Sequence, residues 1–121
     1  MNEARSPLCE HLKDLLHSWG LIGARPMFGG WGLYRGHVMF GLVAEETLFF
    51  KTDASNAGEY TARGMPPFRF ERNGRTVATS YCTVPPDVLE DGDTAACWAE
   101  LAYQAALREA SRDRRDRPRV R

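Results

Sequence analysis

The sequence is poor in cysteine, and its three cysteines are scattered. Cys9, Cys82 and Cys97 show no C-x-x-C spacing, and their number is odd. This pattern excludes a disulfide framework and provides no zinc-binding motif. We therefore expect reduced thiols that are mostly buried, as free cysteines usually are in globular proteins.

Long apolar runs are also missing. No run approaches the roughly 20 residues that a membrane-spanning helix needs, and the polar residues 1–6 are not followed by the hydrophobic segment of a signal peptide. We expect a cytoplasmic protein that makes no contact with a membrane. A length of 121 residues, with 43% hydrophobic and 26% charged residues, predicts one globular domain with a single core.

The chain has no excess charge of either sign, because 16 Lys and Arg balance 16 Asp and Glu. The arginines nevertheless gather at the end, and the rest of the chain is correspondingly acidic. Nucleic-acid binding would therefore have to depend on the C-terminal segment, and it is left open. We predict a domain over residues 1–110 and an arginine-rich flexible tail over residues 111–121. The candidate nucleic-acid contacts in this tail are Arg112, Arg114, Arg115, Arg117, Arg119 and Arg121.

Catalytic and metal-binding motifs are absent as well. The three histidines have no spacing that places two of them on one helix face. The acidic run from Asp87 to Asp93 lacks the alternating ligand positions of an EF-hand and is typical of a helix N-terminus. Cys82 has no neighbouring motif that would activate a thiol. We predict no catalytic residue, no metal ion and no cofactor.

The sequence does contain two amphipathic helices, one near each end. Pro7 starts the first, with Ser6 as its N-cap, and apolar residues recur at helical spacing until Gly20. Asp93 or Thr94 starts the last helix, whose apolar stripe is rich in alanine. Small residues of this kind allow close packing of a helix against a sheet.

Short extended segments fill the middle of the chain. Residues 31–35, 38–44 and 47–52 are rich in aromatic and branched side chains, and two-residue links join them into an antiparallel meander. In the second segment, strict alternation places one set of side chains on each face. The predicted faces are Val38, Phe40 and Leu42 on one side, and Met39 and Val43 on the other.

A short helix and a hairpin follow the meander. Asp53 or Ser55 caps a helix that runs to Arg63. Asn73-Gly74 is the strongest turn signal in the chain and predicts a type I′ hairpin. The element order predicts an α+β fold, a two-layer sandwich of about five mostly antiparallel strands with N-terminal, short middle and C-terminal helices packed on one side.

The glycine cluster between residues 29 and 36 looks at first like a phosphate-binding loop. Counted from Gly30 and Gly32, the third position of a G-x-G-x-x-G motif is Arg35, and an extended segment follows instead of a helix. We interpret these glycines as sites of bulging or close backbone approach at a sheet edge. A surface that receives a ligand or partner is the alternative.

Several motifs in order resemble the N-terminal domain of the TfoX/Sxy competence-regulator family. They are Arg25-Pro-Met-Phe-Gly-Gly-Trp-Gly-Leu-Tyr-Arg35, Val38-Met-Phe40, Leu48-Phe-Phe-Lys51 followed by an Asp, Pro67-Phe68, Ser80-Tyr81 with Val84-Pro85, and Trp98-Ala99. The resemblance implies an α+β domain of bacterial origin that regulates gene expression without being an enzyme. The C-terminal domain of two-domain members has no counterpart here.

Three hypotheses follow for function. The first is a non-catalytic interaction domain that binds transcription machinery or a regulator, with a homodimer left open. The second is a small-molecule-binding domain or enzyme with a pocket near the Arg-Pro-Met-Phe-Gly-Gly motif. The third is weak nucleic-acid binding through the tail. The candidate motif surface consists of Arg25, Met27, Phe28, Gly29, Gly30, Gly32, Lys51 and Tyr81.

Overall fold

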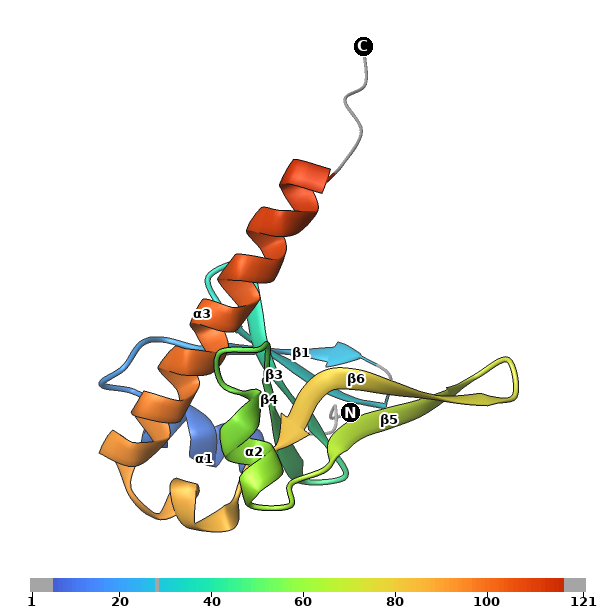
Figure 1. Cartoon of the computed structure of the whole chain (residues 1–121). Coiled ribbons are helices and arrows are strands. Elements are labelled where there is room, and N and C mark those ends of the chain that lie inside the picture. Colours follow the sequence, from blue (N-terminus) through green and yellow to red (C-terminus); the bar gives the residue numbers. More distant parts are fainter. Residues whose placement is uncertain (1–5, 28, 117–121) are drawn as a thin grey trace.

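A six-stranded antiparallel sheet with helices on one face forms the domain (Figure 1). The computed structural model describes residues 6–27 and 29–116. The strand order is β1-β2-β3-β4-β6-β5, so the α+β prediction is confirmed with one strand more than the expected five or so. The elements are α1 (Pro7–Leu15), β1 (Gly23–Met27), β2 (Gly30–Arg35), β3 (Val38–Ala44), β4 (Thr47–Lys51), α2 (Ala57–Ala62), β5 (Pro67–Arg72), β6 (Arg75–Thr83), the 3-10 helix η1 (Pro86–Glu90) and α3 (Gly92–Asp116).

The additional strand is β1, which pairs with β2 at one edge of the sheet. Its sequence, Gly-Ala-Arg-Pro-Met, contains none of the branched or aromatic residues that favour strands. Pro26 is tolerated there because an edge strand leaves part of its backbone unpaired. The strand therefore forms through its pairing with β2 and not through its own propensity.

Helix α1 begins as predicted, and the β3–β4 turn holds its start. The Ser6 hydroxyl accepts a hydrogen bond from the Cys9 backbone N–H at 3.1 Å. It also donates to the Glu46 carboxylate at 2.7 Å, and the second oxygen of that carboxylate accepts from the Leu8 N–H at 3.1 Å. A carboxylate at a helix N-terminus is favourable because it faces unsatisfied N–H groups.

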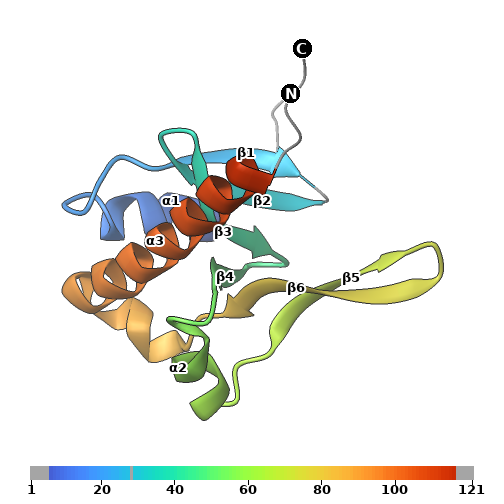
Figure 2. The same cartoon turned by 45° about the horizontal axis from the view of Figure 1, so that its top comes forward.

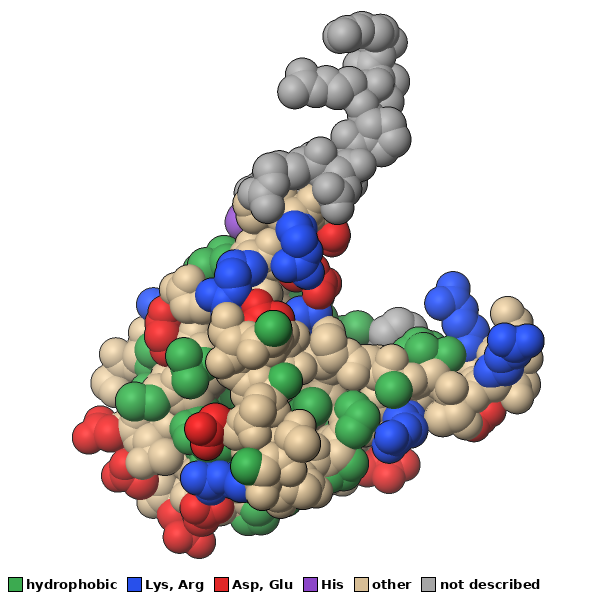
Figure 3. All heavy atoms as spheres, in the orientation of Figure 1, with side chains coloured by type: hydrophobic (Ala, Val, Ile, Leu, Met, Phe, Trp, Pro, Cys, Tyr) green, Lys and Arg blue, Asp and Glu red, His purple; other side chains and the backbone are tan. Residues whose placement is uncertain are grey.

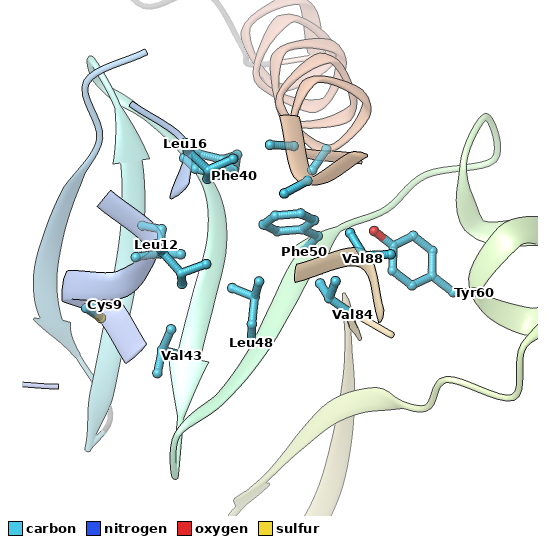
Figure 4. Packing of buried hydrophobic residues seen from close by; sticks show 14 residues of the cluster. Cys9, Leu12, Leu16, Phe40, Val43, Leu48, Phe50, Tyr60, Val84 and Val88 are labelled. Atoms are coloured by element: carbon cyan, nitrogen blue, oxygen red, sulfur yellow. The ribbon is translucent and has the colours of Figure 1, made fainter. Parts of the chain in front are cut away.

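One core lies between the helices and the sheet (Figure 4). Leu12 and Leu16 from the N-terminal segment, and Phe40 and Phe50 from the sheet, are all completely buried. Each such side chain stabilises the fold by about 1.5–3 kcal/mol. The fully buried residues that helix α3 contributes to this core are small, namely Ala95, Ala99 and Ala102, and this lets the helix lie close to the strands as expected, while its larger Trp98 and Tyr103 pack at the margin of the core.

A bulge changes the faces of β3 from those predicted. Leu33 pairs with Gly41 and Tyr34 pairs with Met39, so Phe40 is an extra residue on β3. Alternation is interrupted at this point. As a result Phe40 and Val43 both point into the core, and the prediction that placed them on opposite faces was wrong.

The predicted caps of the later helices also need correction. Helix α2 begins after Asn56, not after Asp53 or Ser55. Helix α3 begins at Gly92, and the carboxylate before it, Asp91, accepts from the Thr94 N–H at 2.9 Å. In both regions the residue before the helix, Asn56 or Asp91, is as suitable an N-cap as the neighbouring residues that the sequence predicted.

Helix α3 continues to Asp116, beyond the apolar stripe that was expected to end near Ala110. The difference has a local cause, because Arg is a good helix former and opposite charges three or four residues apart, such as Glu109 and Arg112, support a solvated helix. The segment from residue 111 to 116, predicted as part of a flexible tail, is therefore helical.

The hairpin of β5 and β6 projects from the body as a two-stranded ribbon (Figures 1 and 2). Its turn has the predicted form, with φ of 52° at Asn73 and 78° at Gly74. Between the pairs Pro67–Cys82 and Arg69–Ala78, β5 has one residue and β6 has three. This bulge, together with the loss of β4 as a neighbour beyond Tyr81, directs the ribbon away from the sheet.

The structure qualifies two further expectations. Among the described residues no helix combines the length and apolar character needed to cross a membrane. The three cysteines are free, but only Cys9 is buried, whereas Cys82 is half-buried and Cys97 is exposed. The expectation of mostly buried thiols therefore holds for Cys9 alone.

Candidate functional site

The helices described in the structure leave one side of the sheet uncovered, and we call it the second face. Helices α1, α2, α3 and η1 all contribute to the single core on the other side. Residues that are paired between neighbouring strands share a face of the sheet. From β1 to β6, the second face therefore carries Arg25, Gly32, Leu42, Phe49 and Thr83 in this order. Six of the predicted surface residues lie on this face: Arg25, Met27, Gly30, Gly32, Lys51 and Tyr81.

Lys51 is the buried charge of this face, with a side chain only 5% exposed. Its ammonium group lies 2.5 Å from a carboxylate oxygen of Glu109 and 2.6 Å from the Ser80 hydroxyl. It also lies 5.2 Å from the centre of the Tyr81 ring. An ammonium group buried to this degree requires such partners, because desolvation without them is costly.

Tyr81 lies directly opposite Lys51 in the β4–β6 pair. Its hydroxyl donates to the backbone carbonyl of Met39 at 3.4 Å. Burial, assisted by the neighbouring Glu109 charge, raises the pKa of Tyr81 to about 12. At neutral pH this phenol is therefore a hydrogen-bond donor and is not a base.

Arg25 packs on an aromatic ring instead of pointing into a cavity. Its guanidinium lies 4.5 Å from the centre of the Tyr34 ring, a favourable cation–π distance. Tyr34 in turn contributes to the raised pKa of Tyr81, which shows that the two phenols are electrostatic neighbours. Arg25, Tyr34, Tyr81 and Lys51 form what we call the polar row.

Gly30 is required by a close backbone contact, and Gly32 lies against a flexible methionine side chain. A Cβ on Gly30 would lie 2.2 Å from the carbonyl oxygen of Val43, and a Cβ on Gly32 would lie 2.7 Å from the sulfur of Met27. Gly29 has φ of 77°, in the left-handed region that favours glycine. Close approach is therefore confirmed at Gly30 and Gly32, whereas a Cβ on Gly29 or Gly36 would meet no atom within 4 Å, and β2 lies between β1 and β3 instead of at a sheet edge. A strand follows the cluster, not the helix that a phosphate-binding loop needs.

A groove of about 620 Å³ opens on the second face, between the β1–β2 turn, the β3–β4 turn and the base of the ribbon. Phe49 forms its floor and packs edge-to-face on Phe68, with ring centres 5.1 Å apart. Figure 3 shows hydrophobic side chains at the base of the ribbon and basic ones toward its outer end. The groove is lined by Gly29, Ala44, Glu45, Thr47, Phe49, Pro66, Pro67, Phe68, Arg69 and Thr83.

The predicted residues are therefore divided between two places. Met27 borders a small extension of the groove beside Phe68, and Gly29 lines the groove itself. Arg25, Lys51 and Tyr81 belong to the polar row. A single pocket around Arg25, Met27, Phe28 and Tyr81 was the second hypothesis, and Phe28 lies outside the described residues.

The predicted tail contacts are placed only in part. Arg112 is exposed on α3, and residues 114 and 115 continue the same helix. Arg117, Arg119 and Arg121 lie outside the described residues. The arginine just before this segment, Arg108, pairs with the Asp53 carboxylate at 2.7 and 3.1 Å.

Three kinds of reactive side chain lie in the described part of the chain: possible metal ligands, thiols and the Lys51 ammonium. No group of three or more His, Cys, Asp or Glu in this part of the chain could hold a metal ion. Burial raises the pKa of the Cys9 and Cys82 thiols, so they are poorer nucleophiles than free cysteine. The Lys51 ammonium is engaged by the Glu109 carboxylate and the Ser80 hydroxyl.

Sequence reasoning missed three contributors to this face. Tyr34 and Ser80 stood inside recognised motifs without an assigned role, and Glu109 was counted only among the charges of the C-terminal segment. The available signal for Glu109 was the need of a buried lysine for a carboxylate partner. Its partner lies 58 positions away, and neither periodicity nor spacing could identify it.

The described residues form a small α+β domain whose second face carries a groove and the polar row. The chain belongs to the TfoX N-terminal domain family, because the model of this family matches residues 14–106. The matched range contains every residue of the polar row and of the groove. No curated protein matches the chain.

Proposed function

We propose that this chain is a non-catalytic regulatory domain that binds a protein partner through the groove on the second face. The observation that carries the proposal is the groove itself, which has aromatic and polar lining residues and to which no described helix contributes. Apolar surface with a polar rim is typical of protein-binding sites. Phe49 and Phe68 supply the aromatic floor, and Glu45 and Arg69 supply the rim.

The chemistry of the polar row supports binding over catalysis. Each of its charged or phenolic groups is engaged within the domain: Lys51 by Glu109, Tyr81 by Met39, and Arg25 by Tyr34. Such groups fix the geometry of the sheet beside the groove. A reacting group would instead need a nucleophile and a base within reach of a bound substrate.

Membership of the TfoX N-terminal domain family supports a partner in gene regulation. We propose that the partner belongs to the transcription machinery or is a transcription regulator, and that competence-type genes are the regulated set. The groove fits an extended or helical peptide segment with apolar side chains, since aromatic residues that line a surface groove can receive such anchors.

Site-specific photocrosslinking in the native cell tests the proposal. A photoreactive residue at position 47, on the rim of the groove, is expected to give one discrete adduct with a transcription protein. The same probe at position 101 is the matched control, since Leu101 is 49% exposed on α3 and lies away from the groove. The adduct at position 47 should disappear when Phe68→Asp removes the apolar wall.

Transcript levels provide the functional readout. Cells with the Phe68→Asp variant should show the same transcript profile as cells without the protein, while circular dichroism shows that the variant is folded. Equal adducts at positions 47 and 101, or transcript profiles that do not change when the protein is removed, would contradict the proposal.

A further inference from the structure

We propose that two copies of this chain associate by pairing β5 with β5 across a twofold axis that passes beside Phe70. The inference concerns the outer edge of the ribbon, not the groove, and does not rest on the proposed function. In the resulting dimer the two six-stranded sheets would form one continuous antiparallel sheet.

The outer edge of β5 offers backbone groups for this pairing. β5 is the last strand of the sheet, and β6 is its neighbour there. A two-residue turn makes Arg72 and Arg75 a hydrogen-bonded pair, and alternation along the ladder then makes Glu71–Thr76 and Arg69–Ala78 non-hydrogen-bonded pairs. The backbone N–H and C=O groups of Arg69 and Glu71 therefore point away from β6, toward the free edge.

The side chains of these two residues select one register. With Phe70 opposite Phe70 of the second copy, Arg69 lies opposite Glu71 twice, and both hydrogen-bonded pairs join opposite charges. A register centred on Arg69 places two arginines opposite each other, and one centred on Glu71 places two glutamates opposite each other. Like charges in these positions are destabilising, so the Phe70-centred register is favoured.

The opposite face of the same pairing is apolar and aromatic. Phe70 meets its twofold copy at a non-hydrogen-bonded position, where side chains approach most closely. Arg72 lies opposite Phe68 of the second copy, a suitable arrangement for a cation–π contact. Phe68 and Phe70 already stack within the chain, with ring centres 6.4 Å apart, so the aromatic surface is pre-organised.

The other edge of the sheet is less suitable. β1 has five residues and contains Pro26, which has no N–H to donate. β5 has its proline at its first position, Pro67, and leaves both Arg69 and Glu71 able to donate. Natural proteins use prolines to protect a sheet edge from pairing, and β1 has one within its paired length whereas β5 has none in its pairing region.

The expected dimer is reversible. Pairing over the four ribbon residues of β5 gives an interface at the small end of the known range, below about 1,200 Å². Association should therefore increase with protein concentration, and it should respond to salt because two exposed charge pairs contribute.

Sedimentation velocity of the full chain over a range of concentrations tests the proposal with reversed charges. Arg69→Glu and Glu71→Arg, each alone, place like charges opposite each other and should weaken self-association by about tenfold or more. An equimolar mixture of the two variants restores opposite charges in both pairs and should associate as the wild type does. The double variant Arg69→Glu/Glu71→Arg should also recover.

Arg75→Glu is the matched control, since it makes the same charge change on the same ribbon but on β6, away from the free edge. It should leave the dissociation constant unchanged. Recovery in the mixture also shows that the single variants are folded. A wild type that stays monomeric at about 1 mM, single variants that associate as strongly as the wild type, or a mixture that fails to recover would each overturn the proposal.

Discussion

Lys51 at the end of β4 and Glu109 on α3 form an ion pair with the ammonium nitrogen 2.5 Å from the carboxylate oxygen. The pair ties the sheet to the part of α3 that extends past it (Figure 1). Arg108 makes a second tie one residue earlier, to Asp53. The C-terminal half of α3 is thus held by charges, whereas its first half is held by alanines packed in the core.

We predict that Glu109→Gln lowers the free energy of unfolding by about 1–2 kcal/mol, because Lys51 stays buried without its carboxylate. Lys51→Met removes the buried charge itself and should cost less. In the double variant the two effects should not add, since both act on one interaction. Urea unfolding of the four proteins measures this cycle, and strictly additive effects would show that the pair is not coupled.

Gly30→Ala should destabilise the domain by about 2–3 kcal/mol, because its Cβ would overlap the carbonyl oxygen of Val43 and force the β2–β3 pair apart. Gly58→Ala is the matched control. It lies in α2 with no atom within 4 Å of the added Cβ, and alanine favours the helix by up to about 1 kcal/mol. Thermal unfolding should move in opposite directions for the two variants.

Alkaline pH should weaken the fold through Tyr81. Its pKa is raised to about 12 in the folded state and is about 10 when unfolded, so the folded state retains the proton more strongly. The stabilisation is complete below pH 10 and is lost as the pH rises from about 10 to 12, by up to about 3 kcal/mol. Tyr81→Phe should flatten this part of the stability profile measured by urea unfolding, and an unchanged slope would contradict the assignment.

Acid should act through Asp53. The hydrogen bond from Arg108 holds the pKa of Asp53 below its usual value, so the folded state favours the carboxylate. This contribution is present above the unfolded pKa, near 4, and is lost as the pH falls through the lower folded value. Asp53→Asn should cost about 0.5–1 kcal/mol at pH 7 and nothing at pH 2, because the pair is partly exposed. A cost that is equal at both pH values would refute the ionic origin.

The sequence predicts the regular part of this fold well. Ser6 and Pro7 identify the first helix because capping is a local property, and Asn73-Gly74 identifies the hairpin because both residues accept positive φ. The family motifs also identify the domain. Each of these signals depends on neighbouring residues, and none requires knowledge of which strand lies beside which.

The missed features depend on contacts between distant residues. β1 forms through pairing with β2, although its own residues do not favour a strand. The bulge at Phe40 is visible only in the β2–β3 register, and Glu109 becomes part of the site only when α3 crosses β4. The groove was predicted only in part: Gly29 of the Arg-Pro-Met-Phe-Gly-Gly motif lines it, but most of its lining comes from the β3–β4 turn and the base of the ribbon, which are distant in sequence.

The bulge between Thr79 and Tyr81 has a consequence for local opening. The ribbon beyond it has one strand neighbour per strand and lies outside the main core, so it can separate without disturbing β1 to β4. Ser80, inside the bulge, still forms a hydrogen bond with Lys51. This bond marks the boundary between the ribbon, which opens, and the main sheet, which stays closed. Amide hydrogens of Phe70 and Val77 should exchange with solvent long before those of Phe50, which gives the domain a fast-opening arm on a slow-opening body.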